Sequence, residues 1–190
     1  MTEPQIAVGI LSGKEIEFSF PIKFISSVGT EIAGTQKAIY QNGKIRWQEK
    51  EYDELSFTPQ QGTHTFFELK NVTIGINFHW ERKEIQKFKG ELKIIIEGEQ
   101  LTAINVIAIE EYLTSVISSE MSATASLELL KAHAVISRSW LLNKLRIEND
   151  KLKKTMPSNS AANSQFSILN SQFIKWYDHE AHKNFDVCAD

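Results

Sequence analysis

The sequence predicts an α+β fold, in which a β-rich N-terminal portion (residues 1–103) precedes a helical portion (residues 104–190) that carries the candidate active-site motif. Up to about Ala103, short apolar runs and alternating apolar and polar residues indicate strands. At Ile109 the apolar period changes from two residues to about 3.6, which is typical of helices. The hydrophobic content of 42% is ordinary for a soluble globular chain and suffices for a core.

Turn residues mark the predicted strands. Asn42-Gly43 between two short apolar segments is a strong hairpin signal, because both residues tolerate positive φ. Gly98 interrupts another pair of apolar runs and predicts a second hairpin. The predicted strands lie at residues 6–11, 38–40, 45–47, 72–80, 92–96 and 101–107.

Charge, apolar run length and cysteine content exclude several classes of protein. A net charge of -3 gives no basic surface for nucleic acid. No apolar run approaches the ~20 residues of a transmembrane helix. The N-terminus shows no secretory signal, so we expect either a cytoplasmic protein or one whose leader is missing from this chain. The single cysteine, Cys188, excludes an internal disulfide and leaves a thiol or a metal ligand.

One acidic residue falls on the apolar side of the first predicted helix. At about 100° per residue, Glu120 shares a stripe with Leu113 and Val116, whereas Ser118 and Ser119 lie opposite. We therefore expect Glu120 to be partly buried. A carboxyl group that loses the hydration of its charged form becomes a general acid near neutral pH. The alternative is that the helix ends near Glu120, which then points to solvent or pairs with a lysine.

The second predicted helix, from a cap at Thr124 or Ser126 to about Asn149, carries two cations in its apolar stripe. Lys131 and Arg138 lie two turns apart, about 10 Å along the axis. Both could line a polar cleft, or extend to solvent along their aliphatic stems. His133 lies off this stripe. A further apolar strip predicts that this helix packs on two faces; it comprises Leu129, Ile136 and Trp140.

Three stretches of the helical portion together form a sequence motif. Residues 104–113 read Ile-Asn-Val-Ile-Ala-Ile-Glu-Glu-Tyr-Leu, residues 116–121 read Val-Ile-Ser-Ser-Glu-Met, and residues 130–139 read Leu-Lys-Ala-His-Ala-Val-Ile-Ser-Arg-Ser. Together they resemble the signature of the stage II sporulation protein D family, which includes the amidase-enhancer proteins. Weaker similarities at residues 6–11, 78–80 and 88–90 extend the resemblance over most of residues 5–145.

The resemblance implies a lytic transglycosylase of the cell envelope, periplasmic or extracellular. Such an enzyme cleaves peptidoglycan glycan strands between N-acetylmuramic acid and N-acetylglucosamine and leaves a 1,6-anhydro end. It implies Glu120 as the catalytic acid and base, with Lys131 and Arg138 lining the cleft. His133 replaces a glutamine of the family pattern and is a candidate sugar contact. The chemistry needs no cofactor, and a cell-wall amidase is a candidate partner.

The sequence departs from the family pattern at several points. Ser122 replaces the usual proline after Glu-Met, and Trp140 replaces a tyrosine. Residues 182–188 resemble the start of a family segment that can bind zinc through histidine and cysteine. His182 and Cys188 would be two ligands, whereas a structural zinc site takes four. The family pattern continues past Cys188, so we expect the chain to be incomplete at its C-terminus.

A polar stretch near residues 155–166 predicts a flexible surface loop. Two other functional readings remain open at this stage. One is a non-catalytic module that binds peptidoglycan or stimulates an amidase. The other is a cytoplasmic scaffold with buried structural ion pairs.

Overall fold

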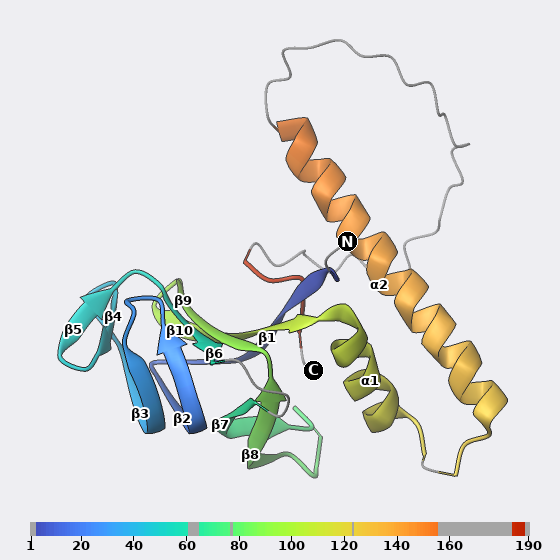
Figure 1. Ribbon diagram of the computed structural model, residues 1–190, viewed down its shortest axis with the longest axis horizontal. Helices are drawn as coiled ribbons and strands as arrows, with labels where there is room; N and C mark the ends of the chain where they lie inside the picture. Colours follow the sequence, from blue (N-terminus) through green and yellow to red (C-terminus); the bar gives the residue numbers. More distant parts are fainter. Residues whose placement is uncertain (1–2, 61–64, 77, 123, 156–183, 189–190) are drawn as a thin grey trace. The chain divides into compact units, whose positions relative to one another are not determined.

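The N-terminal part of the protein is β-rich and two helices follow it, as predicted. The computed structural model describes residues 3–60, 65–76, 78–122, 124–155 and 184–188. These residues divide into two compact units, residues 3–112 with 184–188, and residues 113–155. Figure 1 shows the strands of the first unit and the helices that follow them in the chain.

The described strands form one sheet, which is antiparallel except at its β11 edge. Its main path runs β11-β1-β10-β9-β6-β2-β3-β4-β5, while β7 pairs with β2 and β8 pairs with β7. The strands are β1 (Gln5–Gly13), β2 (Glu15–Ser26), β3 (Glu31–Gln41), β4 (Lys44–Trp47), β5 (Lys50–Tyr52), β6 (Leu55–Pro59), β7 (Phe66–Ile74), β8 (Arg82–Lys89), β9 (Glu91–Glu97), β10 (Gln100–Ala108) and β11 (Val187–Cys188).

Aromatic side chains on one face of β2 build the core. Ile16, Phe18 and Phe20 are buried, whereas the residues between them are partly exposed, because successive side chains of a strand point to opposite faces. Phe20 stacks on Phe24 with ring centroids 4.4 Å apart. Truncating a buried aromatic of this kind to alanine costs about 3–5 kcal/mol. This cluster therefore anchors the sheet on which the other strands assemble.

Both predicted hairpins are present. Asn42 and Gly43, with φ of 50° and 77°, form the two-residue turn between β3 and β4. Gly98, with φ of 61°, lies in the turn between β9 and β10. The predicted strand over residues 72–80 is wrong beyond Ile74. Gly75 adopts a φ of 69°, and the Trp80 ring lies against it, so the chain turns there.

The change of period at Ile109 is confirmed, because α1 (Ile109–Glu120) starts directly after β10. The Ile109 amide donates to the Pro4 carbonyl over 3.1 Å, and the Glu110 amide donates to the Glu3 carboxylate over 3.0 Å. A carboxylate at a helix N-terminus satisfies free amides and complements the helix dipole. The two residues that precede β1 thus satisfy the first amides of α1.

The second helix, α2 (Leu127–Thr155), extends beyond the predicted end near Asn149. Ser126 caps it, since its hydroxyl accepts a hydrogen bond from the Leu129 amide over 3.3 Å. The predicted loop near residues 155–166 lies, past Thr155, outside the described residues. No described helix is apolar and long enough to cross a membrane.

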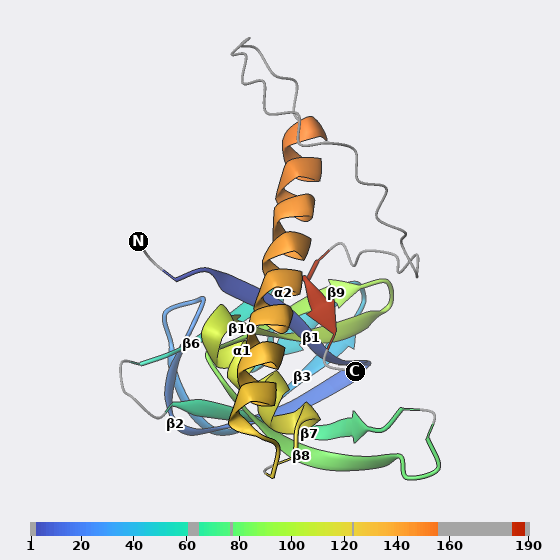
Figure 2. The same ribbon diagram turned by 90° about the vertical axis from the view of Figure 1, so that its right-hand side faces the viewer.

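The C-terminal segment adds a short parallel strand to the edge of the sheet. Figure 2 shows β11 beside β1. The amide of Ala7 donates to Asp186 Oδ2 over 2.7 Å, and the amide of Asp186 donates to the Ala7 carbonyl over 2.8 Å. The Phe185 ring lies directly over Gly9, where a Cβ atom would come within 2.5 Å of it. Gly9 therefore makes room for the segment that ends at Cys188.

Candidate functional site

Glu120 is the last residue of α1, and its side chain is 57% exposed. The prediction that Glu120 is partly buried is wrong. The apolar stripe extends along α1 only as far as the helix does, and a side chain on the final turn has no following turn to cover it. The alternative prediction, that the helix ends near Glu120 and the carboxylate points to solvent, agrees with the structure. The partner of Glu120, however, is not a lysine.

His133 in α2 is the residue that meets Glu120. Its Nε2 lies 3.1 Å from Glu120 Oε2, within hydrogen-bonding distance. The imidazole is largely buried, with 19% of its side chain exposed, whereas the carboxylate that it contacts remains accessible. The pair combines a carboxylate that a ligand can reach with an imidazole that is mostly covered by its surroundings.

The far side of the same imidazole lacks a hydrogen-bond partner. His133 Nδ1 is buried, and no group in the described part of the chain bonds to it. A protonated Nδ1 would be a buried donor without an acceptor, which is unfavourable. The geometry therefore favours the tautomer with its proton on Nε2, directed at Glu120 Oε2. In this tautomer the imidazole donates to the carboxylate and fixes its orientation.

The two predicted cations occupy different surroundings. Lys131 forms its ion pair with Glu128 on the preceding turn of α2, over 3.0 Å, and its side chain is 60% exposed. Ion pairs of this exposed type contribute little to stability, typically 0–1 kcal/mol. Arg138 is half-buried. The structure thus places His133, rather than Lys131, against the carboxylate of Glu120.

Much of the apolar surface of α2 is exposed. Leu141 is fully buried, but Ile136 and Trp140 are 66% and 58% exposed. The prediction that α2 packs on both apolar strips is therefore wrong for the described residues. A periodic pattern shows that a face is apolar, and it does not show that another element covers that face.

The predicted metal ligands are only partly described. Cys188 lies half-buried in β11, and His182 lies outside the described residues. Within the described ranges, no three histidine, cysteine or acidic side chains gather to form a metal site. The zinc pair His182 and Cys188 stays a prediction.

Asn105, in the stretch of residues 104–113, has a role in holding the fold together. Asn105 is buried in β10, and its side-chain amide donates to the carbonyls of Lys89 and Glu91 over 2.7 and 3.2 Å. These carbonyls flank Gly90, whose φ of 86° forms the turn between β8 and β9. Asn105 thus stabilises the turn between β8 and β9 through its two hydrogen bonds, a role that the sequence pattern alone did not indicate.

Comparison with known proteins identifies the segment that contains these residues. Residues 97–190 match the family model described as Stage II sporulation protein. This match supports the assignment of the chain to the stage II sporulation protein D family. This family is associated with the cell envelope. No curated protein and no solved structure matches the chain.

The family match covers β10, both helices and β11, and so includes the Glu120–His133 pair. Residues 1–96 lie outside the match. The weaker similarities noted at residues 6–11, 78–80 and 88–90 stay predictions. The sequence analysis singled out His133 as a candidate sugar contact because it replaces a glutamine of the family pattern, and it missed the contact with Glu120, although either side chain can donate a hydrogen bond to a carboxylate.

Proposed function

We propose that this chain is a lytic transglycosylase that cleaves the glycan strands of peptidoglycan, with Glu120 as the general acid and base. The observation that carries the proposal is the Glu120–His133 pair, an accessible carboxylate held by an imidazole at 3.1 Å inside the family-matched segment. The reaction would take place in the cell envelope, periplasmic or extracellular.

The proposed reaction needs one carboxyl group that works twice. In the first step, protonated Glu120 gives its proton to the glycosidic oxygen, and the bond from that oxygen to C1 of N-acetylmuramic acid breaks. In the second step, the carboxylate takes the proton of the 6-hydroxyl of the same sugar, while O6 forms a bond to C1. The electron pair of the broken bond stays on the leaving oxygen, and water is not consumed. Ordinary glycoside hydrolysis, by contrast, uses two carboxyl groups.

Because Glu120 is exposed, the bound substrate would have to exclude water from its carboxyl group. A general acid is favoured where water is excluded, and the free carboxylate is open to solvent. A polysaccharide chain laid over the end of α1 would displace this water and surround the carboxyl group with apolar sugar faces. The imidazole of His133, with 19% of its side chain exposed, would keep the carboxyl group oriented during that exchange.

The cations of α2 are proposed as substrate contacts. Lys131 is exposed, and its surface ion pair with Glu128 is weak enough to exchange for a sugar carboxylate. Arg138 offers a planar group suited to bidentate contact with a carboxylate or carbonyl. His133 acts here as a positioning residue, because its Nε2 meets Glu120 and its Nδ1 is buried. No cofactor takes part in these steps.

The test uses glycan strands stripped of their peptides, with mass spectrometry to detect 1,6-anhydro ends. General acid–base catalysis typically contributes 10²–10⁴-fold, so Glu120→Gln is expected to lower product formation by at least about 100-fold. Glu111→Gln is the matched control, because Glu111 is another exposed carboxylate of α1 and pairs with the surface Lys89 over 2.9 Å. Equal activity in both variants would refute the role of Glu120.

Variants of His133 test the positioning role. His133→Gln is expected to retain most activity, since the glutamine amide can donate to Glu120 as the imidazole does. His133→Ala is expected to lower kcat while leaving strand binding largely intact.

The second candidate function is a non-catalytic peptidoglycan-binding or amidase-stimulating module, which the openness of Glu120 and the exposed apolar surface of α2 favour. Strand binding without anhydro products in the wild-type chain would support that module.

A further inference from the structure

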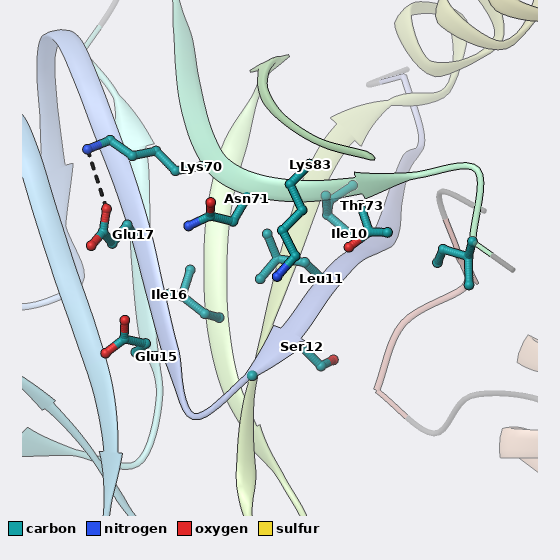
Figure 3. Close-up of a pocket in the computed structure, with 12 residues that line it drawn as sticks. Ile10, Leu11, Ser12, Glu15, Ile16, Glu17, Lys70, Asn71, Thr73 and Lys83 are labelled. Atoms are coloured by element: carbon teal, nitrogen blue, oxygen red, sulfur yellow. Dashed lines mark ion pairs between the residues drawn. The ribbon is translucent and has the colours of Figure 1, made fainter. Parts of the chain in front are cut away.

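A pocket of about 500 Å³ lies in the β-rich unit, between strands β1, β2, β7 and β8. None of the residues used in the proposed reaction lines it. Figure 3 shows its lining, in which polar and apolar side chains face a common space. The apolar part comes mainly from β1 and β2 and comprises Ile10, Leu11 and Ile16.

Two irregularities in the sheet shape this pocket. The pairing of β1 with β10 shifts register between Gly9 and Leu11, and the pairing of β7 with β8 shifts between Leu69 and Val72. The residues within these shifts include Ile10 and Asn71, and both line the pocket. A β-bulge bends its strand and redirects side chains, and bulges are frequent beside functional sites.

Asn71 adopts a left-handed backbone conformation within β7, with φ of 60°. This conformation is uncommon for a residue with a side chain, although asparagine tolerates it better than most. Local strain of this kind is concentrated at binding sites, where the surrounding structure maintains it. The Asn71 side chain lies at the bulge in β7 and lines the pocket. Its amide can offer a ligand two hydrogen-bond donors and one acceptor.

The charges around the pocket leave one cation without a carboxylate. Glu15 pairs with Lys37 over 2.7 Å, and Glu17 pairs with Lys70 over 3.4 Å. The hydrogen bond to Glu15 raises the pKa of Lys37 above its ordinary value. Lys83 forms no ion pair with any residue that the structure describes. Its side chain lines the pocket and extends into it (Figure 3).

We propose that this pocket binds a ligand that carries one carboxylate beside a small group with an amide or a hydroxyl. The carboxylate pairs with the Lys83 ammonium. The polar group bonds to the Asn71 amide and the Thr73 hydroxyl, and the aliphatic part of the ligand rests on Ile10 and Leu11. A second negative charge would face Glu15 or Glu17, so a monoanion is favoured over a phosphate or a dicarboxylate.

This chemistry occurs in two molecular classes, a sugar with an acidic substituent and the C-terminal end of a peptide. The probes distinguish them as matched pairs in which only the carboxylate differs. N-acetylmuramic acid is compared with neutral N-acetylglucosamine, and N-acetylalanine is compared with N-acetylalaninamide. Binding is followed by two-dimensional amide NMR of the whole chain at low salt, because single-group ligands bind in the millimolar range.

The expected result is saturable binding of at least one carboxylate probe, with shifts at the amides of Asn71, Thr73 and Lys83, and no comparable binding of its neutral partner. Lys83→Met is expected to weaken binding by about 10–100-fold, the range for losing a hydrogen bond to a charged group. Lys87→Met, on the same strand and with its ammonium on Glu68 at 3.7 Å, is the control and should bind as the wild type does.

Asn71→Gly separates the side-chain amide from the backbone shape, because glycine adopts positive φ without strain. This variant is expected to fold and to bind several-fold more weakly. The proposal is overturned if neutral probes bind equally well, if no probe binds, if the shifts lie elsewhere, or if Lys83→Met binds as the wild type does. Glu120→Gln should bind the probes normally, so this result and that of the glycan cleavage assay are independent.

Discussion

Asn105 holds the turn between β8 and β9 from inside the sheet, and its removal should destabilise the β-rich unit. Its side-chain amide donates two hydrogen bonds, to the carbonyls on either side of Gly90. A typical intramolecular hydrogen bond contributes about 0.5–1.5 kcal/mol net, so Asn105→Ala should lower the free energy of unfolding by about 1–3 kcal/mol. At roughly 2–4 °C per kcal/mol for a chain of this size, Tm should fall by roughly 2–12 °C.

Asn105→Asp tests the cause of this loss, because it preserves the shape of the side chain and removes its donors. A carboxylate oxygen would then face two carbonyl oxygens in a site that is only 4% exposed, so this variant should be less stable than Asn105→Ala. Thermal unfolding followed by circular dichroism measures both variants. Asn184→Ala is the control, since Asn184 also donates a hydrogen bond, over 2.7 Å to Glu97, but is exposed. An Asn105→Asp variant as stable as the wild type would refute the donor role.

Two further predictions concern strands β1 and β3. Gly9→Ala should displace Phe185 and release the segment at β11, which limited proteolysis would detect as faster cleavage near the C-terminus. Gly13→Ala is the control and should be cleaved as the wild type is, because a Cβ atom there would come no nearer than 3.4 Å to the Glu15 backbone. The Lys23 hydrogen bond lowers the pKa of Glu31 below its ordinary value of 4.5, so the stability that this carboxylate contributes is present above that pH and is lost as the pH falls further. In urea unfolding, the wild type should therefore have a higher free energy of unfolding than Glu31→Gln at pH 7, and this difference should disappear in strong acid. A difference that increased in acid would contradict this assignment.

Local signals predicted the framework of the fold because they depend on neighbours in the chain. The turn at Asn42-Gly43 needs only two residues that tolerate positive φ. The start of α1 at Ile109 follows from a change in apolar period, which is a property of the chain itself. The strand predicted over residues 72–80 is wrong beyond Ile74, because alternation continues in the sequence after Gly75 has turned the backbone.

The sequence by itself determined the family signature, the position of Glu120 in it and the change from strands to helices along the chain. The tertiary structure decided which groups meet. His133 reaches Glu120 across the connection between two helices, thirteen positions along the chain, and no periodic pattern encodes that approach. The Lys83 pocket likewise depends on two bulges in separate strand pairs. Spacing along a chain fixes the direction of a side chain within one element, whereas contact between elements depends on how their surfaces pack.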